Sequence, residues 1–150
     1  NNLAMDISIV SDAKCPVVLT PHFGEMAKIC RTTVQEIQKA PLLCAQELAA
    51  QLKATIVLKG AHTIVASPDG RTFLNQTGNP GLAKAGSGDI LTGILSSLIS
   101  QGMSAFDAAV CAVYLHGAAA DRCVERMSEY FMQPDDILID LGRLLKEHIR

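Results

Sequence analysis

Short apolar runs alternate with longer amphipathic segments along most of the chain. Residues 17–20 and 55–59 are rich in β-branched side chains, a pattern typical of strands buried in a parallel sheet. Apolar side chains at helical spacing predict helices over residues 24–38, 41–53, 89–101, 105–126 and from 134 onward, with a short helix within 1–13. Helices that alternate with buried strands indicate an α/β fold with crossover connections.

Turn and cap signals divide these segments. The tetrapeptide Ser-Pro-Asp-Gly at 67–70 separates the short β-forming runs 63–66 and 71–74, which predicts a β-hairpin. Thr33 and Ser104 each stand three residues before an acidic residue, the spacing of a capping box that starts a helix. The predicted hairpin leads directly into the most glycine-rich part of the chain.

Composition narrows the class of protein. The chain has 150 residues, of which 49% are hydrophobic and 19% charged, so it can form one globular domain with a core. A formal net charge of −2 argues against a nucleic-acid surface. Five scattered cysteines without C-x-x-C spacing predict reduced, mostly buried thiols rather than disulfides or a zinc site. No signal peptide or apolar run of about 18 residues is present, so we expect neither secretion nor membrane spanning.

Residues 75–95 combine five glycines with an abrupt change to a helical pattern of apolar side chains. A glycine-rich turn that feeds a helix N-terminus gathers free N–H groups and the positive end of the helix dipole, an arrangement that binds phosphate. Asp89 would lie in the first turn, where its carboxylate stays ionised and can accept a proton from a hydroxyl. The structural alternative is a glycine-rich connection followed by a helix-stabilising acid.

This stretch lacks the Gly-Lys-Ser/Thr of a P-loop and the G-x-G-x-x-G of a dinucleotide fingerprint. It resembles the G-[ST]-G-D signature of the ribokinase-like superfamily. Its longer form, N-x-x-G-N-x-G-x-A-x-x-G-[ST]-G-D-x-L-T-G, is similar to that of the ADP/ATP-dependent NAD(P)H-hydrate dehydratases. The matching positions are Asn75, Gly78, Asn79, Gly81, Ala83, Gly86, Ser87, Gly88, Asp89, Leu91, Thr92 and Gly93. Lys84-Ala85 departs from the family pattern, which usually has small residues such as Thr-Gly there.

Two other segments carry the same resemblance, and each follows a predicted strand. Residues 19–25 resemble the family's L-T-P-H-x-G-E, which implies that His22 contacts the hydrated nicotinamide substrate. Phe23 stands where proline is common. Ligands in open α/β sheets lie beyond the carboxyl ends of the strands, so this segment would face the pocket. On its position alone, a lone histidine after a strand is more often a hydrogen-bonding loop residue than a catalyst.

The second segment resembles the family's K-G-x-x-T, which lines the adenine-nucleotide site. It consists of Lys59, Gly60, Ala61, His62 and Thr63. Lys59 at the carboxyl end of a strand is well placed to meet a nucleotide phosphate, although its spacing alone equally suits a solvated loop lysine. No chemical role is assigned to His62 within this segment.

The resemblance implies a fold and a reaction. The fold is a three-layer ribokinase-like α/β domain with a mostly parallel sheet, of which residues 1–150 would be the C-terminal portion, without the N-terminal part. The reaction is the ADP- or ATP-dependent dehydration of hydrated NADH or NADPH in the cytoplasm, by kinase-like phosphoryl transfer and elimination. Asp89 would be the catalytic base and a substrate contact, while Gly86, Ser87 and Gly88 would hold the phosphoryl group.

The resemblance also implies cofactors and partners. Mg²⁺ would bridge the phosphates of the nucleotide. No separate metal site formed by protein side chains is expected. Self-association and, in the full-length protein, a fused epimerase domain are expected, whereas nucleic-acid and membrane partners are not. Glu25 would either cap a helix or help to hold magnesium, and His116 would be a core or interface histidine.

Two other functions stay open at this point. A small-molecule kinase of the same superfamily, acting on a sugar, vitamin or thiazole alcohol, would share Asp89 and the anion site. A non-catalytic subunit would bind nucleotide without turnover. A stable phosphorylated product would indicate the kinase, and binding without turnover would indicate the subunit.

Overall fold

The computed structural model describes residues 6–148. Its helices are α1 (Ser8–Ser11), α2 (Phe23–Ile29), α3 (Val34–Lys39), α4 (Pro41–Leu52), the 3-10 helix η2 (Pro80–Leu82), α5 (Ser87–Ser100), α6 (Ala105–Val124) and α7 (Pro134–His148). Its strands are β1 (Val18–Leu19), β2 (Thr55–Leu58), β3 (Ile64–Ala66) and β4 (Thr72–Leu74). The start of the predicted N-terminal helix, residues 1–5, lies outside the described residues, and α1 forms the rest of it.

The four strands form one sheet in the order β1-β2-β3-β4. β1 and β2 are parallel, with Val18 opposite Thr55, and the β3–β4 hairpin is antiparallel as predicted. β2 and β3 are also antiparallel, so the expectation of a mostly parallel sheet is wrong for the strands described here. The reason is the connection: residues 59–63 are too few for a crossover, whereas a tight turn joins antiparallel strands directly.

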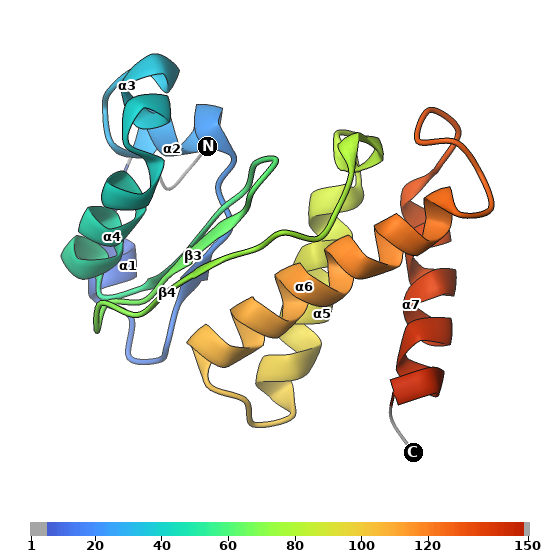
Figure 1. Cartoon of the computed structure of the whole chain (residues 1–150). Helices are drawn as coiled ribbons and strands as arrows, with labels where there is room; N and C mark the ends of the chain where they lie inside the picture. Colours follow the sequence, from blue (N-terminus) through green and yellow to red (C-terminus); the bar gives the residue numbers. More distant parts are fainter. Residues whose placement is uncertain (1–5, 149–150) are drawn as a thin grey trace.

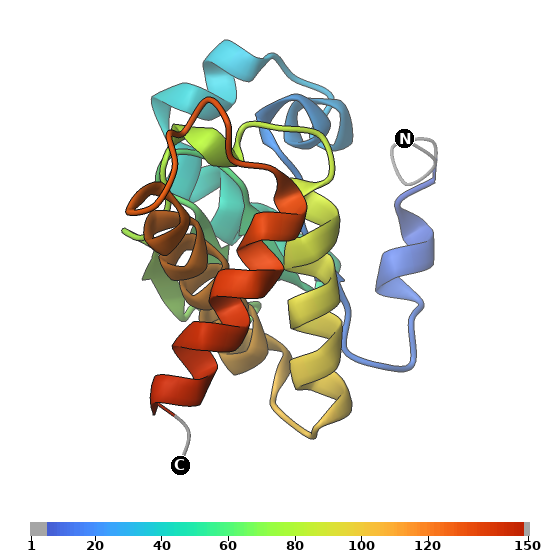
Figure 2. The ribbon, with the colours of Figure 1, turned by 90° about the vertical axis from the view of Figure 1, so that its right-hand side faces the viewer.

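Helices cover both faces of the sheet, which confirms the three-layer α/β architecture (Figure 1). On one face, α2, α3 and α4 pack against the sheet around fully buried side chains such as Met26, Ile37 and Ile56. On the other face, α5 and α6 bury the alternate side chains of the same strands, including Val57 and Val65. α7 packs on α6 and also touches α5 (Figure 2).

Local signals set the helix boundaries. The helix predicted over 24–38 is divided in two, because Arg31 adopts a left-handed φ of 52° between α2 and α3. Thr33 then starts α3, its Oγ1 accepting a hydrogen bond from the Glu36 N–H at 3.2 Å. Ser104 caps α6 in the same way, accepting from the Asp107 N–H at 3.2 Å. The predicted hydrogen bond to the capping hydroxyl is therefore present at the start of both helices.

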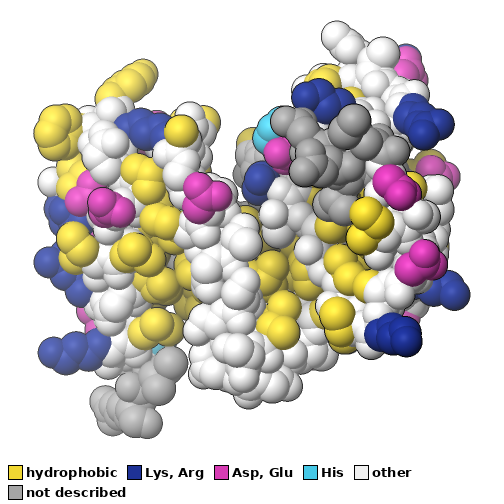
Figure 3. Space-filling view, turned by 180° about the vertical axis from the view of Figure 1, so that it is seen from behind, with side chains coloured by type: hydrophobic (Ala, Val, Ile, Leu, Met, Phe, Trp, Pro, Cys, Tyr) yellow, Lys and Arg dark blue, Asp and Glu magenta, His cyan; other side chains and the backbone are white. Residues whose placement is uncertain are grey.

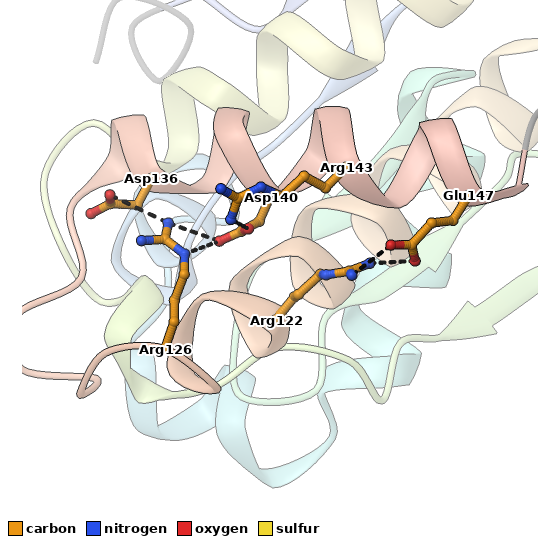
Figure 4. Close-up of polar contacts among 6 residues, drawn as sticks. All are labelled: Arg122, Arg126, Asp136, Asp140, Arg143 and Glu147. Carbon is orange, nitrogen blue, oxygen red and sulfur yellow. Dashed lines mark hydrogen bonds and ion pairs between the residues drawn. The ribbon is translucent and has the colours of Figure 1, made fainter.

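α6 and α7 are joined by a cluster of ion pairs (Figure 4). Arg126 Nε and Arg143 Nη1 each donate to the Asp140 carboxylate at 2.9 Å, although Asp140 is only 1% exposed. Arg122 forms a bidentate pair with Glu147 closer to solvent, with both N–O distances 2.6 Å. These contacts fix α7 along α6, with which it shares a small apolar core around Cys123 and Ile137.

Two expectations from composition can be compared with the structure. All five cysteines are free, but only Cys123 is buried, so the expectation of mostly buried thiols is wrong. Among residues 6–148, none of the helices has the length and hydropathy needed to cross a membrane.

Candidate functional site

A cavity of about 620 Å³ lies where the carboxyl ends of β1 and β2 meet the N-terminus of α5. Its walls come from His22, three residues after β1, and from the 59–63 turn, the glycine-rich stretch and one face of α6. In Figure 3 the molecule is hollowed between its two helical layers, and histidine and basic side chains lie at the edge of the hollow. This is where a parallel α/β arrangement places its ligand.

His22 and Lys59 are brought together by the sheet. They pair in a parallel β-bridge that continues β1 and β2, and the Lys59 N–H donates to the Pro21 carbonyl at 2.8 Å. Both side chains line the cavity. The two segments predicted separately as substrate and nucleotide contacts therefore meet at one edge of the sheet.

His22 is held by a capping box at the start of α2. Its Nδ1 accepts hydrogen bonds from the N–H groups of Gly24 and Glu25 at 3.0 and 3.2 Å. Glu25 completes the box, its Oε2 accepting from the His22 N–H at 2.8 Å. Because Nδ1 is an acceptor, Nε2 carries the proton in the neutral ring, and it lies 3.6 Å from Glu25 Oε1. The capping role expected for Glu25 is confirmed.

The 59–63 turn is closed by Thr63, whose Oγ1 donates to the Gly60 carbonyl at 3.3 Å. The Phe23 ring packs over Gly60 so closely that a Cβ there would lie 2.8 Å from Cε2. Lys59, Gly60, Ala61 and Thr63 line the cavity, whereas His62 is exposed and does not. His62 therefore lies outside the wall of the cavity, whereas the other four residues of the predicted nucleotide segment form part of it.

The first part of the glycine-rich stretch is fastened to α6. Asn75 is buried, and its Nδ2 donates to the carbonyls of Thr77 and Val113 at 3.0 and 3.3 Å. Thr77 Oγ1 donates to the Tyr114 carbonyl at 3.0 Å. A Cβ on Gly117 would lie 2.6 Å from the Thr77 carbonyl oxygen, so only glycine permits this approach.

Asp121 is a site-forming residue that sequence reasoning missed. Its Oδ2 accepts from the Gly78 N–H at 2.8 Å, and its Oδ1 accepts from Asn79 Nδ2 at 3.1 Å. Asp121 lies four residues after Gly117, so both are on the face of α6 that contacts the stretch. The spacing of four residues indicates that Gly117 and Asp121 share a helix face, but it does not show which segment that face contacts.

The second part of the stretch starts α5. Gly86 is its N-cap with a left-handed φ of 92°, and Ser87 follows as a buried residue. The N–H groups of Ser87 and Asp89 donate to the carbonyls of Lys84 and Gly86 at 3.3 and 3.1 Å. A Cβ on Gly88 would lie 3.3 Å from Lys59 Nζ, so the ammonium stands directly over the first turn. An ammonium at a helix N-terminus makes a strong anion site.

Asp89 follows in the first turn with an exposed side chain. Ser87 and Gly88 line the cavity, while Gly86 and Asp89 do not. Asp89 therefore lies beside the anion site on the solvent side of the helix. Its role as the base stays a prediction.

His116 supports the anion site from α6. It is 7% exposed, lines the cavity, and has Nε2 3.3 Å from Ser87 Oγ. Burial lowers the pKa of His116 to about 4; the positive charge of Lys59 also lowers it, while a hydrogen bond with the Ser87 backbone acts in the opposite sense. The expected core histidine is confirmed, and it is neutral at physiological pH.

Protonation of His116 should make the protein less stable in mild acid. Its folded pKa of about 4 lies below the unfolded value of about 6.5, so the unfolded chain binds the extra proton first. Stability should fall as the pH drops from about 6.5 to about 4, by about 3 kcal/mol in all. Urea titrations across this range should show the fall, and His116→Gln should reduce it.

His62→Gln is the matched control, because His62 is an exposed histidine. Its pH profile should follow that of the unsubstituted protein. An equal acid loss in His116→Gln would contradict the assignment to His116.

Comparison with known proteins identifies the family. The family model described as NAD(P)H-hydrate dehydratase matches residues 1–142. The chain belongs to the NAD(P)H-hydrate dehydratase family. The bifunctional NAD(P)H-hydrate repair enzyme of Moorella thermoacetica is 44% identical over 97% of this chain and 28% of its own length. The ADP-dependent (S)-NAD(P)H-hydrate dehydratase of Neisseria meningitidis is 49% identical over 70% of this chain and 36% of its own length.

A solved member of the family has the same fold. The ADP/ATP-dependent NAD(P)H-hydrate dehydratase of Bacillus subtilis, co-crystallized with ATP/Mg²⁺, superposes with a TM-score of 0.84 at 42% identity. The match covers 88% of this chain and 48% of that protein. The chain thus spans about half the length, or less, of the relatives it matches. A ribokinase-like superfamily protein of Enterococcus faecalis also matches, with a TM-score of 0.77 at 30% identity over 95% of this chain and 50% of that protein, which confirms the ribokinase-like fold predicted from the sequence.

Proposed function

We propose that this chain forms the nucleotide side of an NAD(P)H-hydrate dehydratase, an ADP- or ATP-dependent lyase that restores hydrated NADH or NADPH. One observation carries the proposal. In a chain of this family, Lys59 Nζ stands over Gly88 at the N-terminus of α5, at the end of a 620 Å³ cavity. An ammonium and a helix N-terminus that converge on one point suit a phosphate group.

The nucleotide would occupy the cavity between the 59–63 turn and the glycine-rich stretch. Lys59 would bind a phosphate oxygen, and Gly60, Ala61 and Thr63 would contact the remainder of the nucleotide. His62 is exposed outside this wall, so we leave it out of the proposed contact set. His22, at the neighbouring strand end, would use its Nε2 to contact the hydrated nicotinamide.

The chemistry would begin at Asp89. Its carboxylate would take the proton from the ring hydroxyl, whose oxygen then attacks the terminal phosphoryl group of the nucleotide and displaces the rest of it. Lys59, Ser87 and Gly88 would stabilise the charge on the transferred group at the helix N-terminus. The phosphorylated intermediate would lose phosphate with the C–O bonding pair, and loss of a proton would restore the dihydronicotinamide.

Magnesium fits this site as the counter-ion of the nucleotide. Mg²⁺ is usually held by one or two carboxylates together with phosphate oxygens and water. Residues 6–148 contain no group of three or more His, Cys, Asp or Glu side chains suited to a metal ion. Glu25, with Oε2 3.9 Å from Lys59 Nζ, is the carboxylate that we propose as a protein ligand. When bound, the ion would neutralise phosphate charge.

Lys59→Met should weaken nucleotide use. A charge-assisted hydrogen bond contributes about 1.5–3 kcal/mol, so KM for ADP or ATP should rise about tenfold or more. Steady-state kinetics of the full-length protein would measure it. Lys39→Met is the matched control, because Lys39 is exposed and pairs only with the exposed Glu36 among the contacts of the described residues. An unchanged KM in Lys59→Met would contradict the phosphate contact.

The proposed reaction is tested directly by incubating the full-length protein with hydrated NADH, Mg²⁺ and ADP or ATP. Recovery of dihydronicotinamide absorbance, with release of one phosphate for each molecule restored, is the expected result. Nucleotide consumption with a stable phosphorylated alcohol would identify a kinase instead. Nucleotide binding without either product would identify a binding subunit.

The remaining expectations concern the whole protein. The Moorella relative is named as bifunctional, which supports a second activity such as a fused epimerase in the full-length protein. We propose self-association and a cytoplasmic location on the family resemblance. Light scattering of the full-length protein would test the first of these.

A further inference from the structure

Lys84 interrupts the family pattern, and its ammonium has an unusual environment. Nζ donates hydrogen bonds to three backbone carbonyls, those of Glu129 at 3.3 Å, Tyr130 at 2.8 Å and Met132. All three belong to residues 125–133, which join α6 to α7 and are called the α6–α7 loop below. An ammonium has three N–H donors and no acceptor, so its hydrogen-bonding capacity matches the three carbonyls.

The α6–α7 loop is held at its base independently of Lys84. Arg126, at its start, pairs with Asp136 at 3.5 Å and with Asp140 at 2.9 Å (Figure 4). The Gln133 N–H donates to Asp136 Oδ2 at 2.9 Å and starts α7. Residues 129–132 lie between these anchors. Lys84 therefore binds residues 129–132, the part of the loop that the ion pairs of Arg126 do not reach.

The same loop supports the outer side of the glycine-rich stretch. A Cβ on Gly81 would lie 2.7 Å from Met132 Cε and 3.0 Å from the Glu129 carbonyl oxygen. A Cβ on Gly86 would lie 3.2 Å from Pro134 Cγ. Lys84 lies between Gly81 and Gly86 in sequence. The glycine-rich stretch therefore contacts the α6–α7 loop, or Pro134 directly after it, at three successive points.

The inner side of the stretch is the wall of the nucleotide cavity. Lys84 itself lines the cavity, as do Asn79, Leu82 and Ser87 on either side of it. The three carbonyl oxygens that converge on Lys84 Nζ would repel one another unless a cation or donors occupied the space between them. Without the ammonium, the carbonyls would turn toward water, and the stretch would lose its outer support.

We propose that Lys84 acts as a built-in cation, whose ammonium fills a cage of three backbone carbonyls and so fixes the glycine-rich stretch in its nucleotide-binding form. Lys84 is then a positioning residue, because it acts on the nucleotide through the stretch and the α6–α7 loop. For its link to nucleotide affinity, the proposal rests on the proposed function. The cage itself depends only on the contacts of Lys84.

The test uses chemical rescue of Lys84→Ala in the full-length protein. Loss of three charge-assisted hydrogen bonds should weaken ADP or ATP binding about tenfold and lower Tm. Ethylammonium supplies the missing head and part of the stem, so millimolar concentrations should restore both quantities. Tetramethylammonium has the same charge but no N–H donor, and it should restore neither. Lys146→Met, on an exposed lysine of α7, should behave like the unsubstituted protein.

Lys84→Met separates the ammonium from the packing of the stem. It keeps the stem but has no N–H donor, so it should show the same loss. Its terminal methyl leaves no room for ethylammonium, so the loss should not be rescued. If Lys84→Ala fails to fold, Lys84→Met still measures how loss of the ammonium changes nucleotide affinity and Tm.

Selective rescue by ethylammonium supports the proposal. Three results would overturn it. They are equal responses to both ions, no rescue of a folded Lys84→Ala, and unchanged nucleotide affinity and Tm in both Lys84→Ala and Lys84→Met. If the unsubstituted protein binds no nucleotide, the proposed function fails. The Tm of Lys84→Ala with each of the two ions then still tests whether the Lys84 ammonium stabilises the three carbonyls.

Discussion

Asp89→Asn should lower kcat for restoration of hydrated NADH by about 10²–10⁴-fold, the usual size of a general-base effect. The amide keeps the shape of the carboxylate but cannot accept the proton of the ring hydroxyl. Asp89 lies in the first turn of α5 with its side chain exposed, one residue after Gly88 over which the Lys59 ammonium stands. On the proposed mechanism, its carboxylate would accept the proton of a hydroxyl that approaches the bound phosphate from the solvent side.

The same substitution should leave nucleotide binding intact or slightly tighter, because it removes a negative charge near an anion site. Kinetics with hydrated NADH and calorimetry with ADP or ATP separate the two effects. Asp135→Asn is the matched control, since Asp135 is an exposed carboxylate in the first turn of α7. If Asp89→Asn retained kcat within threefold, another group would have to be the base.

Asp140→Asn should destabilise the protein by about 3 kcal/mol, the scale for loss of one partner from a buried ion pair. Asp140 is 1% exposed and accepts from Arg126 and Arg143 on different oxygens, so an amide there would lose the charge and place its NH2 group against one of the two guanidinium groups. Burial raises the pKa of Asp140, but hydrogen bonds from Cys123 and the two arginines outweigh it and leave the pKa lowered. This stabilisation is therefore present at neutral pH and lost only as the pH falls below about 3.8.

Thermal unfolding followed by circular dichroism would measure the change, which corresponds to a Tm lower by about 10 °C for a chain of this size. Glu147→Gln tests the outer pair of the same two helices. Glu147 is 51% exposed in its bidentate pair with Arg122, so that substitution should cost only about 0–1 kcal/mol. Equal losses in the two variants would show that burial of Asp140 does not set the strength of the cluster.

The local features of the fold could be predicted from the sequence, because they depend on neighbours in the chain. Periodicity located α4, α5 and α6, and the Ser-Pro-Asp-Gly turn located the β3–β4 hairpin. The strand ends predicted that the segments of His22 and Lys59 face the pocket, and the β-bridge between them shows that the two segments meet. The glycine-rich motif indicated the family before any contact was known.

Other features follow only from the tertiary structure, because they join residues far apart in the chain. The direction of β3 depends on the short turn after β2. Asp121 reaches Gly78 across 43 positions, His116 reaches Ser87 across 29, and Lys84 reaches the Met132 carbonyl across 48. A side chain's type limits what it can bind, but packing of α6 and its loop against the glycine-rich stretch decides which partner it meets.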